Sequence, residues 1–334
     1  MRTVFYLAVL CASLSHAWAD DGVAALGAGG LVLGKSEDIA MVDENLILSE
    51  NEVNVTFRFL NESDRDIDTL VEFPLPLFTP DPNGPSVDSL EKFTVVVDGV
   101  RVTHIKKEIH AWLKGKDITG ELASYGIVPI DYFDGDDLLF DAAVRKLSSA
   151  QIAELKAKGF IGGSPDLYGL YGLWQTQVLY YWKQRFPAHK TLVVQHRYAP
   201  ATGIEDMFPS DTDWRKHLTQ EECVESKIWK ALDKKWAVLE KEEQALKEKN
   251  PQSLILQMAH GKQVDYILTS ANSWKGPIRH FRLTLKKRPD EILSTCFEGL
   301  KKKSSTEFVF ETTNFTPTRE LSFYLFEPLS IQAS

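Results

Sequence analysis

Apolar and polar residues alternate strictly in one segment early in the chain. Val53, Val55, Phe57 and Phe59 are separated by single polar residues. Successive side chains of an extended strand point to opposite faces, so this period of two turns one face of the segment toward a core. The segment therefore predicts a half-buried β-strand rather than a helix.

Similar strand patterns recur along the chain. Asp98-Gly99 separates two β-prone runs, 93–97 and 100–109, which predicts a tight hairpin. We expect a mainly β fold, an antiparallel and immunoglobulin-like β-sandwich with helical insertions. The later strands are expected at 179–182, 191–198, 264–268, 281–285, 308–310 and 321–326.

Two segments carry helix signals. Ser148 and Gln151 have the spacing of a capping box, and Gly159 stands where a glycine often ends a helix. Thr219 and Glu222 repeat the capping-box spacing, which predicts a second helix that begins near Thr219. Its apolar stripe at helical spacing consists of Ile228, Trp229, Leu232, Trp236, Leu239 and Leu246.

These patterns divide the chain into six segments without a low-complexity linker, so we expect helices inserted between the strands of one unit. The segments are a signal peptide (1–19), N-terminal sandwich strands (20–111), a helical and loop insertion (112–172), further sandwich strands (173–204), a helical segment (205–261) and C-terminal strands (262–334).

The N-terminus has the layout of a secretory signal. Arg2 precedes the apolar run 4–14, and a small-residue site at Ala17 and Ala19 stands before Asp20. That run is shorter than the roughly 20 residues that a membrane span needs. We expect cleavage between Ala19 and Asp20 and a periplasmic or secreted protein with no transmembrane segment afterwards. A buried N-terminal helix is the alternative.

Two cysteines remain after this cleavage, Cys223 and Cys296. An even number of cysteines in an oxidising compartment favours a disulfide between them. The alternatives are two free buried thiols or a pair of metal ligands. The net charge of −9 argues against a nucleic-acid partner, because phosphate binding needs clustered Lys and Arg.

Two acidic stretches are candidate calcium loops. Asp81, Asn83 and Asp88 surround Gly84, and Asp134 and Asp136 flank Gly135. Calcium takes six to eight oxygen ligands, but neither stretch has the EF-hand spacing. Asp-rich and Asn-rich turns also form for conformational reasons alone, and we favour that interpretation. We therefore predict neither a metal nor a cofactor.

A glycine-spaced aromatic stretch is the one candidate ligand site. Tyr168, Tyr171 and Trp174 could stack on a sugar ring or an apolar ligand if they are exposed. If they are buried, they anchor the insertion to the sandwich, which is the interpretation we favour. A ligand site, if present, is expected where the insertion meets the sandwich.

No local motif identifies an enzyme. The sequence has neither a Gly-x-Ser-x-Gly elbow nor a His-Glu-x-x-His zinc helix. Catalytic residues can nevertheless assemble from distant positions, so enzymatic activity stays open and no catalytic residue is named.

Several short stretches follow one another along nearly the whole chain after the N-terminal apolar run. They are Gly27-Ala28-Gly29-Gly30-Leu31-Val32, Asp38-Ile39-Ala40-Met41, Phe73-Pro74-Leu75-Pro76, Phe186-Pro187-Ala188, His196-Arg197-Tyr198 with Pro200, Trp274-Lys275-Gly276-Pro277-Ile278 and Asn314-Phe315-Thr316-Pro317. Together they resemble a bacterial exported family known as domain of unknown function 4424. The resemblance implies an exported, sandwich-like β protein and carries over no catalytic residue.

We expect a non-enzymatic periplasmic protein that binds a small molecule or a partner protein of the envelope. A hydrolase whose site is assembled from dispersed residues is one alternative. A structural or assembly factor of the envelope is another.

Overall fold

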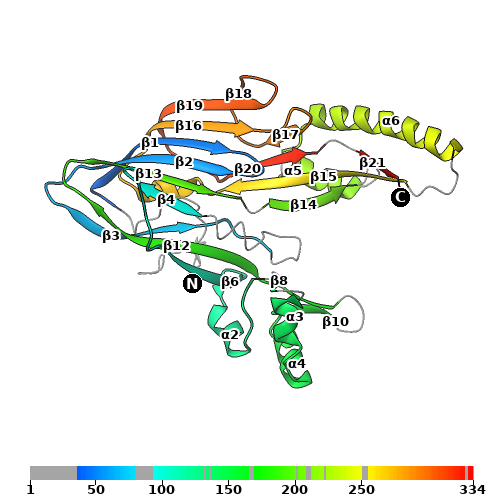
Figure 1. Ribbon diagram of the computed structural model, residues 1–334, viewed down its shortest axis with the longest axis horizontal. Helices are drawn as coiled ribbons and strands as arrows, with labels where there is room; N and C mark the ends of the chain where they lie inside the picture. The colour runs from blue at the N-terminus through cyan, green and yellow to red at the C-terminus, as the bar shows by residue number, and fades with distance from the viewer. Residues whose placement is uncertain are drawn as a thin grey trace, which may run out of the picture.

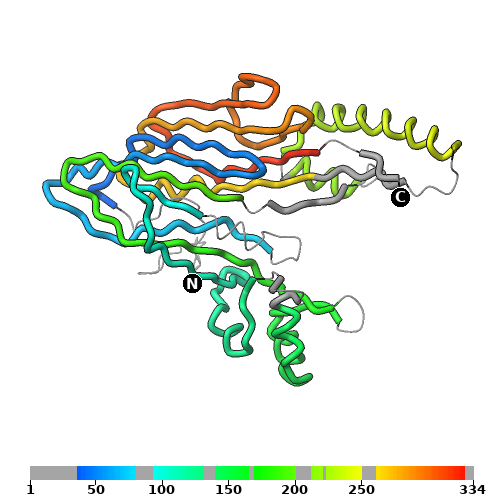
Figure 2. Tube along the Cα trace, in the orientation of Figure 1, coloured from blue at the N-terminus to red at the C-terminus, as the bar shows by residue number. Residues whose placement is uncertain are grey.

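The computed structural model describes the chain from residue 36 to residue 333 with several gaps (Figures 1 and 2). The described ranges are 36–79, 93–130, 133–134, 137–164, 169–200, 202–207, 212–221, 223–249, 255–327 and 330–333. The predicted cleavage site at Ala19 and Asp20 lies outside these residues.

The largest sheet has eight strands in the order β18-β19-β16-β1-β2-β13-β4-β5. Its neighbours are antiparallel except β1 and β16, which are parallel and come from opposite ends of the chain, as the blue and orange traces in Figure 2 show. The strands are β1 (Ile39–Leu48), β2 (Val53–Asn61), β4 (Thr94–Val97), β5 (Val100–Arg101), β13 (Thr191–Tyr198), β16 (Ile278–Lys286), β18 (Lys301–Lys302) and β19 (Glu307–Phe315).

Two smaller antiparallel sheets accompany it. The four-stranded sheet has the order β3-β12-β6-β7, and the five-stranded sheet has the order β14-β15-β20-β17, with β21 also paired to β15. Their strands are β3 (Ile67–Pro74), β6 (Lys106–Leu113), β7 (Lys116–Asp117), β12 (Gln175–Phe186), β14 (Thr202–Met207), β15 (Ile255–Tyr266), β17 (Ile292–Thr295), β20 (Leu321–Phe326) and β21 (Ser330–Ala333).

The alternating residues of β2 confirm the period-two prediction. Val53, Val55, Phe57 and Phe59 are each at most 1% exposed and belong to a core that all three sheets share. Trp274, on the loop before β16, packs on Phe59 with ring centroids 4.2 Å apart. Burial of each such side chain contributes about 1.5–3 kcal/mol, so this face of β2 holds the sheets together. The mainly β prediction is thus confirmed, and the immunoglobulin-like arrangement stays a prediction.

The hairpin at Asp98-Gly99 is also confirmed. Both residues have positive φ, 47° and 80°, as a two-residue turn between twisted strands requires. The expected long strand over 100–109 is wrong, however. The chain leaves the eight-stranded sheet after Arg101 and enters the four-stranded sheet at Lys106 as β6, so this β-prone run contributes strands to two sheets.

The insertion has a core of its own. Its elements are α2 (Thr119–Ser124), β8 (Phe133–Asp134), β9 (Asp137–Leu138), α3 (Leu139–Val144), α4 (Ser149–Ala157), β10 (Ile161–Ser164) and β11 (Gly169–Gly172). Ser148 and Gln151 form the predicted capping box of α4, and Gly159 has the positive φ of 70° expected after its end. The three helices group beside β6 and β12 in Figure 1 and pack around Leu122, Leu155 and Trp174.

The second helical region is split into α5 (Thr212–Glu221) and α6 (Ser226–Lys249). The predicted helix start at Thr219 is wrong, because this residue lies inside α5. Its hydroxyl donates to the Arg215 carbonyl at 2.7 Å and accepts from Trp229 Nε1 at 2.8 Å, so it joins the two helices instead of capping one. Strand β15 also begins earlier than expected, at Ile255. The predicted apolar stripe of this helix is confirmed at its centre, where Leu232 and Trp236 are buried.

The predicted disulfide is present. Cys223, between α5 and α6, is bonded to Cys296, directly after β17, with their Cα atoms 5.1 Å apart. It ties the helical region to the five-stranded sheet. In the part of the chain that the structure describes, no helix combines the length and apolar character needed to cross a bilayer.

A five-residue 3₁₀ helix, η1 (Thr269–Ser273), follows β15 and completes the described elements.

Candidate functional site

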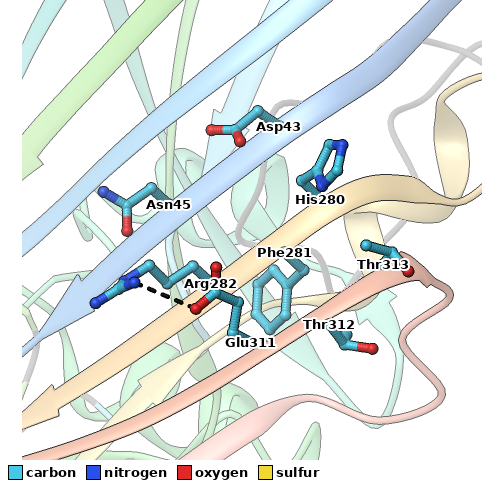
Figure 3. Close-up of a pocket in the computed structure, with 8 residues that line it drawn as sticks. All are labelled: Asp43, Asn45, His280, Phe281, Arg282, Glu311, Thr312 and Thr313. Atoms are coloured by element: carbon cyan, nitrogen blue, oxygen red, sulfur yellow. Dashed lines mark hydrogen bonds and ion pairs between the residues drawn. The ribbon is translucent and has the colours of Figure 1, made fainter.

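A polar groove of about 530 Å³ lies on the outer face of the eight-stranded sheet (Figure 3). It crosses three adjacent strands, β1, β16 and β19. Its volume falls within the roughly 300–1,000 Å³ of small-molecule sites. The lining residues are Asp43 and Asn45 of β1, His280, Phe281 and Arg282 of β16, and Glu311, Thr312 and Thr313 of β19.

The strand register brings opposite charges and amides together. Arg282 stands beside Asn45 of β1 on one side and Glu311 of β19 on the other. Because side chains alternate along a strand, His280 shares the face of Arg282, and Asp43 shares the face of Asn45. Rigid paired strands, rather than loops, therefore hold these groups.

A bulge in β1 determines which acid faces the groove. Met41 pairs with Phe59, whereas Asp43 pairs with Arg58, so Val42 is an extra residue in β1. A bulge shifts the alternation by one residue. As a result Met41 and Glu44 both point into the core, each 2% exposed, and Asp43 points into the groove.

The Arg282 side chain in the groove can change its orientation at little cost in free energy. Arg282 Nη1 lies 3.3 Å from Glu311 Oε2, and the two side chains are 46% and 67% exposed. An exposed ion pair of this kind contributes about 0–1 kcal/mol. Arg282 can therefore turn toward an anionic ligand group with only a small loss of stability.

Asn45 supplies an acceptor that the described residues leave unsatisfied. Its side-chain oxygen is buried and has no hydrogen-bond partner among them. An unpaired buried acceptor costs about 1–3 kcal/mol, which a ligand hydroxyl or ammonium group would recover. Because this oxygen is buried, the Asn45 side chain would have to turn toward the groove before a ligand donor could bind it.

The groove does not contain an assembled hydrolase constellation. Within the described part of the chain, His280 makes no hydrogen bond to an acid or a hydroxyl, and the Phe281 side chain is buried rather than available for stacking. The arrangement offers charges and hydrogen-bonding groups for recognition rather than a prepared nucleophile.

Sequence comparison decides the family. A profile described as Domain of unknown function (DUF4424) matches residues 19–323. The chain belongs to the DUF4424 family. The family resemblance noted from the sequence is thus confirmed, and it brings no assigned activity with it. No curated protein sequence matches the chain.

Among solved structures, this DUF4424 member is similar to a crystal structure from Legionella pneumophila subsp. pneumophila str. Philadelphia 1, of a protein provisionally named as nutrient binding. The two are 13% identical, with a TM-score of 0.43, and the match covers 90% of this chain and 70% of the other.

The glycine-spaced aromatics of the DUF4424 chain are divided between surface and core. Trp174 is 2% exposed, and its Nε1 donates to the Pro129 carbonyl at 3.4 Å. Tyr171 is 54% exposed and lies over Gly162, where an added Cβ would come within 2.8 Å of the tyrosine ring. Tyr168 lies outside the described residues. The buried position of Trp174 favours packing, whereas the exposed Tyr171 stays the candidate ligand contact.

The two candidate calcium loops lie almost entirely outside the described residues. Asp81, Asn83, Asp88 and Asp136 lie outside the described residues, and only the backbone of Asp134, in β8, is described. The interpretation of these stretches as plain turns therefore stays a prediction.

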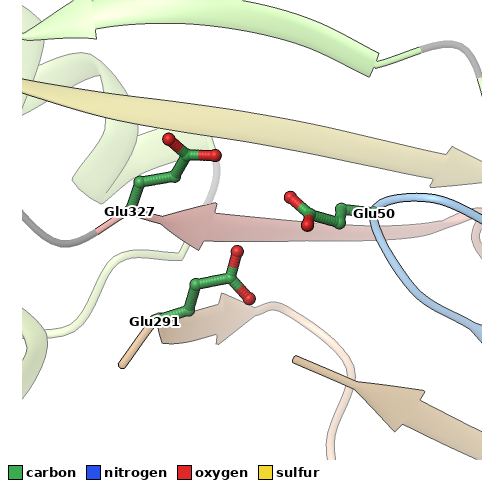
Figure 4. A group of neighbouring side chains, drawn as sticks. All are labelled: Glu50, Glu291 and Glu327. Atoms are coloured by element: carbon green, nitrogen blue, oxygen red, sulfur yellow. The ribbon is translucent and has the colours of Figure 1, made fainter. Parts of the chain in front are cut away.

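A different acidic group, which sequence reasoning missed, joins three segments (Figure 4). Glu50 lies between β1 and β2, Glu291 precedes β17 and Glu327 follows β20, and one oxygen of each lies within 4.8 Å of the others. Nothing local signals this group, because its members are more than 30 residues apart in sequence.

Two cations already lie among these carboxylates. Lys262 Nζ is 2.9 Å from Glu50 and also contacts Glu327, and Arg288 is 3.0 Å from both Glu291 and Glu327. Burial and the charge of Glu50 raise the pKa of Glu291. Burial opposes ionisation of Glu327, but hydrogen bonding from Lys262 lowers its pKa overall. The group is an ion-pair network that fixes strand ends, and a metal ion would have to displace a lysine.

The buried His196 is a core residue rather than a catalytic one. It is 1% exposed and stacks on Phe73 with ring centroids 4.6 Å apart. Burial lowers its pKa to about 3, so the imidazole is neutral at any physiological pH.

Proposed function

We propose that this protein is an exported, non-enzymatic binding protein that holds a small polar molecule in the groove across β1, β16 and β19. The ligand would carry an anionic group for Arg282 and hydrogen-bond donors for Asp43 and Asn45. The observation that carries the proposal is the unpaired, buried Asn45 oxygen beside a weakly held arginine. Binding a small polar molecule requires polar groups in fixed positions and does not require a nucleophile.

Export is supported by two independent features. The N-terminal pattern is that of a cleavable signal, and the Cys223–Cys296 disulfide is of a kind that persists in oxidising compartments such as the periplasm. Mass spectrometry of the exported protein should then show an N-terminus at Asp20. A mature protein that retains residues 1–19 would contradict export by this signal.

The binding test uses isothermal titration calorimetry against amino acids, short peptides, sugar acids and phosphorylated sugars. Arg282→Gln should weaken binding of the ligand so found by about 10-fold or more, because a hydrogen bond to a charged group contributes about 1.5–3 kcal/mol. Asn45→Leu should weaken it by a similar factor. Lys286→Gln is the matched control, since Lys286 is exposed on the same strand but does not line the groove.

Unchanged affinity in Arg282→Gln and Asn45→Leu would reject the groove as the site. Failure of the whole panel to bind would reject the ligand class. Turnover of a bound compound that stops in Arg282→Gln would instead favour the hydrolase alternative.

A further inference from the structure

A second polar cluster lies on a different sheet, on the outer face of β6 and β12. Glu108 and His110 are two residues apart on β6 and therefore share one face. The opposite face of β6 carries Ile109 and Ala111, which pack in the cores. The cluster also includes Asp117 of β7 and Tyr181 of β12, and it is remote in the fold from the groove on the eight-stranded sheet.

Asp117 fixes the orientation of the His110 ring. Its Oδ2 lies 3.1 Å from His110 Nδ1. The other oxygen of Asp117 accepts from the Thr119 amide at 2.8 Å and the Thr119 hydroxyl at 2.5 Å. Burial opposes ionisation of Asp117, but these hydrogen bonds lower its pKa overall. An ionised carboxylate can only accept, so Nδ1 carries the proton and Nε2 of a neutral ring presents a lone pair.

Tyr181 fixes Glu108 in the same way. The Tyr181 hydroxyl donates to Glu108 Oε1 at 2.5 Å, and this hydrogen bond is the main reason that the pKa of Tyr181 is raised. The remaining oxygen, Oε2, lies 3.5 Å from His110 Nε2. Asp117 therefore orients His110, and Tyr181 orients Glu108, each through a hydrogen bond.

The two facing atoms are both acceptors when His110 is neutral. His110 Nε2 is buried and has no hydrogen bond among the described residues, although a carboxylate oxygen lies 3.5 Å away. A lone pair that faces an anionic oxygen is stable only with a positive species between them, either a proton on Nε2 or a metal ion. Two ligands bonded to zinc at about 2.1 Å in tetrahedral geometry lie about 3.4 Å apart, close to the separation seen here.

The carboxylates of Glu72, Glu108 and Asp117 lie near His110, and the Lys106 ammonium lies 5.8 Å from the centroid of the Tyr181 ring. Among the described residues, no Lys or Arg forms an ion pair with Glu108 or Asp117, nor with Glu72, which lies on the far side of β12. Burial and the charge of Glu108 raise the pKa of Glu72, whereas His110 lowers it. A cation at Glu108 and His110 would reduce the repulsion among these carboxylates.

We propose that His110 Nε2 and Glu108 Oε2 bind a divalent transition-metal ion, of which Zn²⁺ is the appropriate probe, with water completing the coordination. Asp117 and Tyr181 orient the two ligands, as carboxylates and hydroxyls commonly do around metal-bound histidine. Glu72 accepts a hydrogen bond from a metal-bound water. An imidazole ligand favours such ions over calcium, which prefers oxygen ligands alone.

The test is calorimetric titration of the metal-free mature protein with Zn²⁺ and, separately, with Ca²⁺. One Zn²⁺ per chain should bind, and Ca²⁺ should not compete. His110→Ala should abolish this binding, and Asp117→Asn and Tyr181→Phe should each weaken it by about 10–100-fold. His189→Ala is the matched control, because His189 also contacts an aspartate, Asp64 at 2.8 Å, but on the exposed surface.

Tyr181→Phe removes one exposed hydrogen bond and should fold, so it keeps the test decisive even if His110→Ala does not fold. Zn²⁺ binding that persists in His110→Ala, or that is lost in Glu50→Gln instead, would overturn the proposal. So would the absence of Zn²⁺ binding together with an NMR titration in which His110 holds its second proton well above pH 7, because a proton would then occupy the position.

Discussion

Glu44 accepts a hydrogen bond from the Tyr266 hydroxyl at 3.3 Å in the core that the three sheets share. Glu44 is 2% exposed and Tyr266 is fully buried. Burial raises the pKa of Glu44 to about 8, although the hydrogen bond from Tyr266 opposes the shift. The β1 bulge therefore has two consequences, since it turns Asp43 into the groove and a protonated glutamic acid into the core.

The stability of the protein should fall as the pH rises from about 4.5 to about 8. The folded state keeps the Glu44 proton over this range while the unfolded state has lost it, so the folded state binds more protons and rising pH favours unfolding. The contribution of Glu44 is about 5 kcal/mol at most, fully present below the unfolded pKa. Urea unfolding at a series of pH values measures it.

Glu44→Gln should flatten this profile, because the amide keeps the size and the hydrogen bond without a titrating proton. The variant should also be more stable than the natural chain above pH 8. Glu298→Gln, at an exposed position, is the control and should leave the profile unchanged. Parallel profiles for Glu44→Gln and the natural chain would refute the assignment.

Lys262→Met should destabilise the fold by about 3 kcal/mol, because loss of one partner from a largely buried ion pair leaves uncompensated charge. Lys262 is 20% exposed, and its partners Glu50 and Glu327 are 7% and 19% exposed. Adding Glu50→Gln to Lys262→Met should restore part of the loss. Lys183→Met, on the exposed face of β12, should change the free energy of unfolding by less than about 0.5 kcal/mol. Additive effects in the double variant would show that the two residues are not coupled.

The double change Cys223→Ser and Cys296→Ser should cost about 4 kcal/mol, as expected for a long closed loop. The sequence separation is 73 residues. The Ser294 hydroxyl, which donates to the Cys223 carbonyl at 3.2 Å, would still hold the two segments near each other. Denaturant unfolding of the oxidised natural chain, the reduced natural chain and the double variant measures this cost. The reduced chain and the double variant should have the same free energy of unfolding. An equally stable double variant would mean that the bond does not constrain the unfolded state.

Local patterns in the sequence predicted local structure well. The alternation in β2, the turn at Asp98-Gly99 and the capping box at Ser148 each depend on residues within one element, and the structure confirms all three. The start predicted at Thr219 failed because its spacing is equally compatible with a position inside α5 that binds Trp229. A capping-box spacing marks a helix start only where no helix already runs through those residues.

The candidate sites could not be predicted because they depend on register between distant strands. Asn45 and Arg282 are neighbours only because β1 and β16 pair in parallel, a pairing that no sequence pattern announces. The polar run Asp43-Glu44-Asn45, between Val42 and Leu46 of β1, is a local signal that this strand carries more than core residues. The cluster at His110 has no local signal either, because Asp117 reaches His110 from β7 and Tyr181 reaches Glu108 from β12.

Trp174 and Tyr171 should respond differently to truncation. Trp174→Ala should cost about 3–5 kcal/mol, because it opens a cavity in the core of the insertion, to which Trp174 belongs. Tyr171→Ala should change the free energy of unfolding by less than about 0.5 kcal/mol, since the side chain is 54% exposed. Thermal and urea unfolding of both variants measure the difference. If Tyr171 contacts a ligand, Tyr171→Ala should weaken ligand binding and leave the free energy of unfolding unchanged. A variant that binds the ligand with the affinity of the natural chain but is much less stable would show that the Tyr171 ring, like Trp174, serves packing.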